Sequence, residues 1–152
     1  MKKILISLSF ILSATALVWA QDSMPPAQYF YADDIGTDLA ASLSQRPFLG
    51  IGVISVGEDY NIHMIRRNEP AGAIVHPDGT ELHYIVEGAG ILTTGGIAVR
   101  PESGGAASIE GGYSQRVTVG DLVLIPRGTP HQYTAVEGVV GYLEVRFRTE
   151  EY

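Results

Sequence analysis

The residues best suited to bind a metal ion lie in two segments that are well separated in the sequence. The first segment runs from His76 to Gly90 and contains Glu81 and His83, and the second ends at His131. Imidazole and carboxylate groups bind divalent Fe, Mn, Ni and Zn, and a small set of them leaves coordination positions open for a substrate. The chemistry that these residues indicate is that of a catalytic metal, acting as a Lewis acid or an oxygen-activating centre.

Each segment is predicted to present its polar groups from a strand. Side chains of a β-strand alternate between faces, so in the strand predicted to begin at Glu81 the Glu81 and His83 side chains point into the same space. His131 follows a strand-like run and a turn at Pro126–Gly128, which places it at the start of the next strand. Tyr133 shares the face of His131 and is a candidate proton donor or acceptor; the alternative is a core tyrosine with a hydrogen-bonded hydroxyl.

The second segment is similar to the second sequence motif of the cupin superfamily. That motif reads G-x5-P-x-G-x2-H-x3-N, and this chain lacks only its final Asn. The matching residues are Gly120, Pro126, Gly128 and His131, with Ala135 at the position of the Asn.

The first segment resembles the first motif of the same superfamily, G-x5-H-x-H-x3-4-E-x6-G. Aligned on Glu81 and Gly88, the motif places its second His on His76. Its first His falls on Ile74 and its leading Gly on Asn68. One metal ligand of the family is therefore replaced by a hydrocarbon side chain.

The resemblance covers Ile51 to Arg148 and implies a double-stranded β-helix, the jelly-roll cupin barrel, with metal ligands at His76, Glu81 and His131. His83 has two interpretations. It completes a set of three His and one Glu in place of the ligand missing at Ile74, or it stands beside the metal as an acid or base, which either supports the ligands from behind or faces the substrate.

The hydrophobic pattern independently predicts an all-β domain with a short N-terminal helix. Nine strand-like runs separated by Gly, Pro and Asp turns follow Gly50. They are 51–56, 60–67, 72–75, 81–86, 91–94, 116–119, 122–125, 131–136 and 139–148. A helix is predicted over Asp33–Ser44, because Ile35, Leu39 and Leu43 recur at four-residue spacing and Pro47 ends it. The expected organisation is a leader over residues 1–20, an arm and helix over 21–48, and the barrel over 49–152.

Residues 1–20 have the pattern of a cleaved export signal. Lys2 and Lys3 precede the apolar run Ile4–Val18, and Val18-Trp19-Ala20 has small residues at its outer positions, as a cleavage site does. The sequence therefore predicts an exported protein, periplasmic or secreted. The chain has no cysteine, so neither a disulfide nor a thiolate metal site contributes to it.

The charge of the chain argues against two classes of partner. Its formal net charge is −7, and both lysines lie in the leader, so the exported part is more acidic still. This acidity is unfavourable for binding nucleic acid or an anionic membrane. The partner that we expect is a small molecule. Tyr29 and Tyr31 in the N-terminal arm are candidates for packing on a second subunit, which would fit the homodimers frequent among cupins.

The stretch Gly95–Ser114 contains three Gly-Gly pairs and is predicted to be an inserted hairpin or a rim loop, with a role as a lid as a further hypothesis. For the whole protein the leading expectation is a divalent-metal enzyme of the oxygenase, isomerase, decarboxylase or lyase type. The alternative is a non-catalytic protein that binds a sugar or a small carboxylate.

Overall fold

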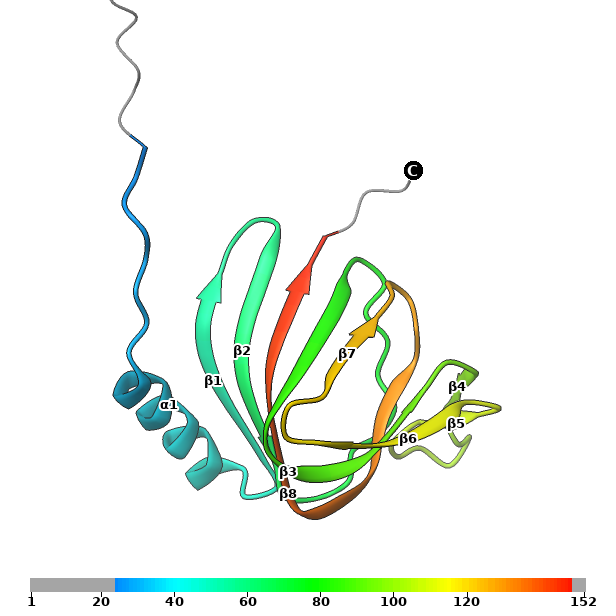
Figure 1. The fold of residues 1–152 in the computed structure, drawn as a ribbon. Helices are drawn as coiled ribbons and strands as arrows, with labels where there is room; N and C mark the ends of the chain where they lie inside the picture. The colour runs from blue at the N-terminus through cyan, green and yellow to red at the C-terminus, as the bar shows by residue number, and fades with distance from the viewer. Residues whose placement is uncertain (1–23, 149–152) are drawn as a thin grey trace, which may run out of the picture.

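The computed structural model describes residues 24–148. One helix precedes a series of β-strands, and residues 24–31 extend away from the barrel (Figure 1). The elements are α1 (Ala32–Gln45), β1 (Leu49–Val56), β2 (Tyr60–Arg67), β3 (Thr80–Thr94), β4 (Ile97–Val99), β5 (Ser108–Glu110), β6 (Tyr113–Thr118), β7 (Leu122–Ile125) and β8 (His131–Phe147). The expected leader, residues 1–20, lies outside the described residues. Within residues 24–148, no helix is long and apolar enough to cross a membrane.

The strands form a curved antiparallel sheet in the order β1-β2-β8-β3-β6, with β7 also paired to β3. A separate two-stranded sheet contains β4 and β5. The long strands β3 and β8 pair from Thr80 opposite Phe147 to Thr94 opposite His131, and they bend together through the base of the molecule in Figure 1. The all-β jelly-roll fold with a short N-terminal helix is confirmed.

The sequence predicted a break within each long strand, and the structure has bulges there instead. The register of β3 against β8 shifts between Ile85 and Glu87, between Gly88 and Gly90, and between Ile91 and Leu92. Gly88 has a φ of 63°, and a Cβ at Gly90 would lie 2.7 Å from the Ala135 carbonyl oxygen. These glycines therefore allow one strand to bend and continue where a turn was expected.

The core fills the concave side of this sheet. Its buried side chains are Ile65, Ile85, Leu92, Val117, Ile125, Tyr133, Val140 and Tyr142. Leu49 and Ile51 of β1 pack against the same cluster. Because strand side chains alternate, the intervening residues of β1 face the other way, toward the helix.

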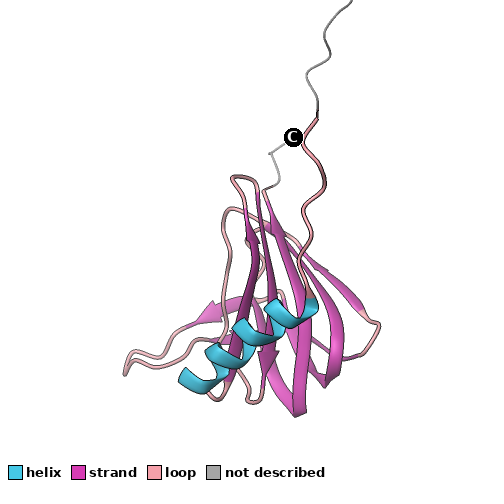
Figure 2. Ribbon diagram, turned by 90° about the vertical axis from the view of Figure 1, so that its left-hand side faces the viewer, coloured by secondary structure: helices cyan, strands magenta, loops and turns pink. Residues whose placement is uncertain are grey.

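Helix α1 lies across β1, as the side view in Figure 2 shows. Two glycines of β1 allow this close approach: a Cβ at Gly50 would lie 2.7 Å from Leu43, and one at Gly52 would lie 3.1 Å from the Ile35 carbonyl oxygen. The periodic residues Ile35, Leu39 and Leu43 are the half-buried face of the helix. The predicted helix and its apolar stripe are thus confirmed, with one more residue at each end.

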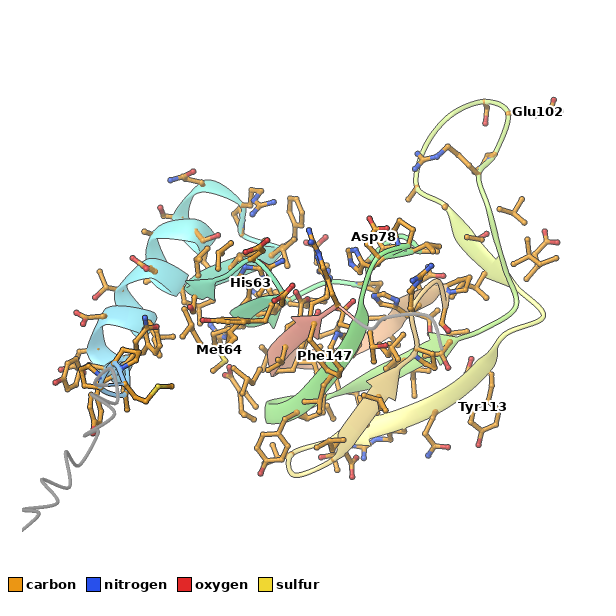
Figure 3. The ribbon with its side chains drawn as sticks, turned by 90° about the horizontal axis from the view of Figure 1, so that it is seen from above. His63, Met64, Asp78, Glu102, Tyr113 and Phe147 are labelled. Atoms are coloured by element: carbon orange, nitrogen blue, oxygen red, sulfur yellow. The ribbon has the colours of Figure 1, made fainter. Side chains whose placement is uncertain are left out.

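The stretch Gly95–Ser114 contains the hairpin β4-β5, in agreement with the first of its two interpretations. Figure 3 shows Glu102 at the tip of the connecting loop, away from the barrel. The predicted strand 72–75 is wrong, since the structure has only an isolated bridge between Ile74 and His131 there. This segment is held at single points, by hydrogen bonds of Ala73 to Ala107 and of Ile74 to His131.

Candidate metal centre

Three polar atoms from the two motif segments converge at the inner wall of the barrel. His76 Nε2 lies 3.4 Å from Glu81 Oε2, and His131 Nε2 lies 3.5 Å from the same oxygen. All three atoms are buried, and none has a hydrogen-bond partner among the described residues. Buried polar groups without partners are rare in folded proteins, and a missing ion is one explanation for them.

The spacing of the three atoms suits a bound divalent metal. Two ligands that each lie about 2.1 Å from one metal in tetrahedral geometry are separated by about 3.4 Å. The measured separations of 3.4 and 3.5 Å agree with this value. His76, Glu81 and His131 therefore fit a metal, and they supply two nitrogens and one oxygen to it.

The second motif positions His131 and fixes its protonation. Gly120 and Gly128 have φ angles of 94° and 74°, so each turn needs a residue that tolerates a left-handed backbone. The His131 Nδ1 atom lies 3.1 Å from the Thr129 carbonyl oxygen, which can only accept a hydrogen bond. Nδ1 therefore carries the proton, and in the neutral ring Nε2 presents its lone pair to the centre.

Backbone contacts tie His76 to the second motif. Its carbonyl oxygen accepts a hydrogen bond of 2.9 Å from the Gly128 amide. Its neighbour Ile74 exchanges two hydrogen bonds of 3.0 Å with His131. The His76 and His131 rings consequently lie 5.5 Å apart.

The pKa shifts of Glu81, His76 and His131 favour the protonation states that bind a cation. Burial raises the pKa of the Glu81 carboxyl, but the hydrogen bond from His83, together with the positive charges that His83 and His131 carry once protonated at low pH, outweighs burial and lowers the pKa to about 2. Burial lowers the pKa of both His76 and His131. At neutral pH the centre thus presents an ionised carboxylate and neutral imidazoles, the forms that bind metals.

His83 lies beside this group, and both of its ring nitrogens are engaged. Its Nε2 atom lies 2.9 Å from Glu81 Oε1, and its Nδ1 atom lies 3.3 Å from the Tyr133 hydroxyl. A carboxylate can only accept, so His83 Nε2–H donates to Glu81, and in the neutral ring Nδ1 accepts from Tyr133. In this arrangement His83, which is 1% exposed, holds Glu81 and has no lone pair left for a metal. This favours the second interpretation, in the form of a support for Glu81 and not of a group that faces the substrate.

Tyr133 belongs to the aromatic core. It is 2% exposed, its ring lies 5.1 Å from that of Tyr142, and the Tyr142 ring stacks 4.2 Å from His83. Burial, followed by the charge of Tyr142, raises the pKa of the Tyr133 hydroxyl, so it stays protonated at neutral pH. It therefore acts as a core tyrosine whose hydroxyl is hydrogen bonded, and it touches the centre only through His83.

Sequence reasoning missed Glu144 and Arg146 of β8. Glu144, His83 and Glu81 bring one ligand atom each within 4.8 Å of one another. Arg146 donates to Glu144 at 3.0 Å and brings Nε within 3.6 Å of Glu81 Oε2. Nδ1 of His63, on β2, lies 3.2 Å from Oε1 of Glu144. Alternation from the core residue Tyr142 would have placed Glu144 and Arg146 on the inner face.

A pocket of about 590 Å³ opens beside the centre. His76, Glu144, Arg146 and Ile74 are among the residues that line it. The hydrocarbon at position 74 thus stands in the cavity beside His76, where the first His of the motif would be.

Comparisons with known proteins agree on the fold alone. No family model matches this sequence, and no curated protein matches it either. Among solved structures, KdgF from Halomonas sp. matches with a TM-score of 0.52 at 16% identity, over 69% of this chain and 84% of that chain. A predicted oxalate decarboxylase from Thermotoga maritima matches with a TM-score of 0.51 at 14% identity, over 66% and 81% of the two chains. The cupin domain of Cnp3 from Schizosaccharomyces pombe matches with a TM-score of 0.52 at 10% identity, over 66% and 65%.

Proposed function

This chain has the cupin fold, and from that premise we propose that it is an exported divalent-metal enzyme acting on a small polar molecule. The observation that carries the proposal is the convergence of three buried, unpartnered ligand atoms from His76, Glu81 and His131. A fold shared by many unrelated activities does not support a function, so the proposal rests on this site.

The residues around the proposed centre have separate roles. His76, Glu81 and His131 would hold Fe, Mn, Ni or Zn, which would supply Lewis acidity or oxygen activation and leave positions open for the substrate. His83 donates to Glu81 and keeps the carboxylate in place. The Tyr133 hydroxyl in turn fixes the ring of His83.

The proposal of export rests on the leader over residues 1–20, which has the charge and apolar pattern of a signal peptide. Cell fractionation followed by N-terminal sequencing of the recovered protein tests it. We expect the protein outside the cytoplasm, with its N-terminus at Gln21. A cytoplasmic protein that keeps Met1 would contradict it.

Elemental analysis tests the metal centre. Protein purified from its exported form should contain near-stoichiometric Fe, Mn, Ni or Zn, and Glu81→Ala and His131→Ala should each remove most of it. His63→Ala is the matched control, because His63 pairs with Glu144 and lies outside the converging trio. Equal metal content in the parent and both site variants would refute the assignment. The metal identified would then narrow the reaction among oxygenase, isomerase, decarboxylase and lyase types.

One observation favours a second candidate, a non-catalytic protein that binds a sugar or small carboxylate. The position of the first motif His holds Ile74, and the Arg146 guanidinium stands 3.6 Å from the Glu81 oxygen that a metal would use. A positive charge there competes with a metal for Glu81. Purified protein that stays metal-free after anaerobic incubation with each ion, yet binds a small ligand, would favour this candidate.

A further inference from the structure

We infer that the pocket beside the metal centre takes a small organic anion, with its carboxylate held by Arg67 and an apolar body lying on β1 and β2. The inference deepens the proposed function and rests on it for the reacting end of the ligand only. It is carried by the charges and the shape of the pocket, which are independent of any metal.

The pocket has the size and the mixed lining of a small-molecule site. Its volume of about 590 Å³ lies within the range of roughly 300–1,000 Å³ usual for ligand pockets. Of the proposed metal ligands, His76 lines the pocket. Arg67 and Arg100 are cationic members of the lining, and Leu49, Ile51 and Ile65 are apolar members. A ligand that fills it must therefore offer both an anionic group and hydrocarbon.

Arg67 is a half-buried cation that forms no ion pair with the carboxylates described between residues 24 and 148. Other arginines of the barrel are neutralised: Arg66 pairs with Glu87 at 2.9 Å, and Arg146 with Glu144 at 3.0 Å. A guanidinium taken out of water without a counter-charge is unfavourable. In a chain with a formal charge of −7, a cation left without a carboxylate in a pocket indicates that its partner comes with the ligand.

The core holds Arg67 in place for such a partner. Its Nε atom donates to the Tyr142 hydroxyl at 3.0 Å, and its guanidinium carbon lies 5.8 Å from the centre of the Tyr133 ring. Its terminal nitrogens make no hydrogen bond to a described residue, although the side chain lines the pocket. Two free parallel N–H groups on a fixed guanidinium match the two oxygens of a carboxylate.

Arg100 adds a second positive charge from the loop that follows β4. It donates to the Gly105 carbonyl oxygen at 2.6 Å and likewise forms no ion pair among the described carboxylates. Glu69 also lines the pocket, but it is exposed and pairs with neither arginine. The pocket wall therefore attracts anions, and the hairpin contributes to it through Arg100.

The apolar wall separates this ligand class from sugars and inorganic anions. Leu49 and Ile51 of β1 and Ile65 of β2 offer no hydrogen-bonding group to a ring of hydroxyls. Burial of methylene or aromatic carbon against them contributes about 25 cal/mol per Å². The favoured ligand is a monocarboxylate with a hydrocarbon or aromatic body.

Calorimetric titration with matched acids and amides tests the inference. Butyrate, hexanoate and benzoate are each compared with the corresponding neutral amide, on the exported protein as purified. We expect at least one acid to bind and its amide to bind at least about tenfold more weakly, since the amide loses the charge-assisted pair with Arg67. Acids that all fail to bind, or that bind no better than their amides, would overturn the inference.

Three variants at two neighbouring arginines locate the effect. Arg67→Gln should weaken acid binding at least about tenfold and leave amide binding unchanged. Arg67→Lys should keep only part of the affinity for the acid, because lysine has the charge without the planar fork of the guanidinium. Arg66→Gln is the control, as Arg66 neighbours Arg67 on β2 but pairs with Glu87. Thermal melting confirms that each variant is folded. Unchanged acid binding in folded Arg67→Gln would overturn the role of Arg67.

The metal content of each sample separates this inference from the proposed function. Acid binding that depends on Arg67 in a protein without metal would support the inference and refute the enzyme proposal. A protein that binds metal at His76, Glu81 and His131 but shows no preference for acids over amides would support the enzyme proposal and refute the inference.

Discussion

Replacing Glu81 with glutamine should destabilise the metal-free protein by an amount that depends on pH. Glu81 is 1% exposed, and its pKa falls from 4.5 to about 2 on folding. A pKa that is lower in the folded state means that ionisation stabilises the fold. This stabilisation is complete above pH 4.5 and is lost as the pH falls toward 2.

The size of the effect follows from the shift. A change of one pKa unit corresponds to about 1.4 kcal/mol, so the shift of Glu81 corresponds to about 3 kcal/mol at pH 7 and about 1 kcal/mol at pH 3. Glutamine has the shape of the protonated acid and cannot ionise. Glu81→Gln should therefore lower the free energy of unfolding by about 3 kcal/mol at pH 7, and by about 1 kcal/mol at pH 3.

Urea unfolding in the presence of a chelator measures this quantity at both pH values. Glu87→Gln is the control, since Glu87 is a carboxylate with a 45% exposed side chain paired to Arg66, and such pairs contribute about 1 kcal/mol or less. A cost at Glu81 that is the same at pH 7 and pH 3, or a more stable Glu81→Gln, would refute the electrostatic account of the centre.

Three further substitutions test other parts of the structure. Ile74→His supplies the missing motif ligand beside His76 and should tighten metal binding by about tenfold or more in competition with a chelator; unchanged affinity would show that position 74 does not reach the metal. Tyr133→Phe removes the hydroxyl beside His83 Nδ1 and should cost about 1–3 kcal/mol in urea unfolding, whereas a cost near zero would mean that this hydrogen bond is not formed. Gly88→Ala forces a Cβ against the Val139 carbonyl at a φ of 63° and should lower the free energy of unfolding by about 2 kcal/mol or more; a neutral effect would contradict the bulge described here.

The local sequence pattern was enough to predict those features of the fold and the site that depend on residues close together in the sequence. The turn at Pro126–Gly128 and the start of the following strand are set by residue types whose backbone preferences are strong, so the place of His131 followed directly. The strand Tyr60–Arg67 was predicted to its ends, because a turn signal stands at each end of it. Alternation then placed Glu81 and His83 on one face, as the structure has them.

The remaining residues depend on the register between strands, which the pattern does not contain. Glu144 reaches the centre because β8 sets it opposite both His63 of β2 and His83 of β3. A shift of one residue in either pairing would turn it to the outside. Similarly, the Tyr142 hydroxyl that holds the Arg67 guanidinium comes from β8, the strand paired with β2.

The two oxygens of Glu81 have different surroundings in the centre. Oε1 accepts a hydrogen bond from His83, whose other nitrogen is held by Tyr133 in the core. Oε2 faces His76, His131 and Arg146 at 3.4 to 3.6 Å without a hydrogen bond. Because the fold fixes Oε1, Oε2 keeps its direction without a metal. A metal ion that binds there does not have to order the carboxylate. The same argument implies that His83→Ala weakens metal binding, because it releases the Glu81 oxygen that His83 holds.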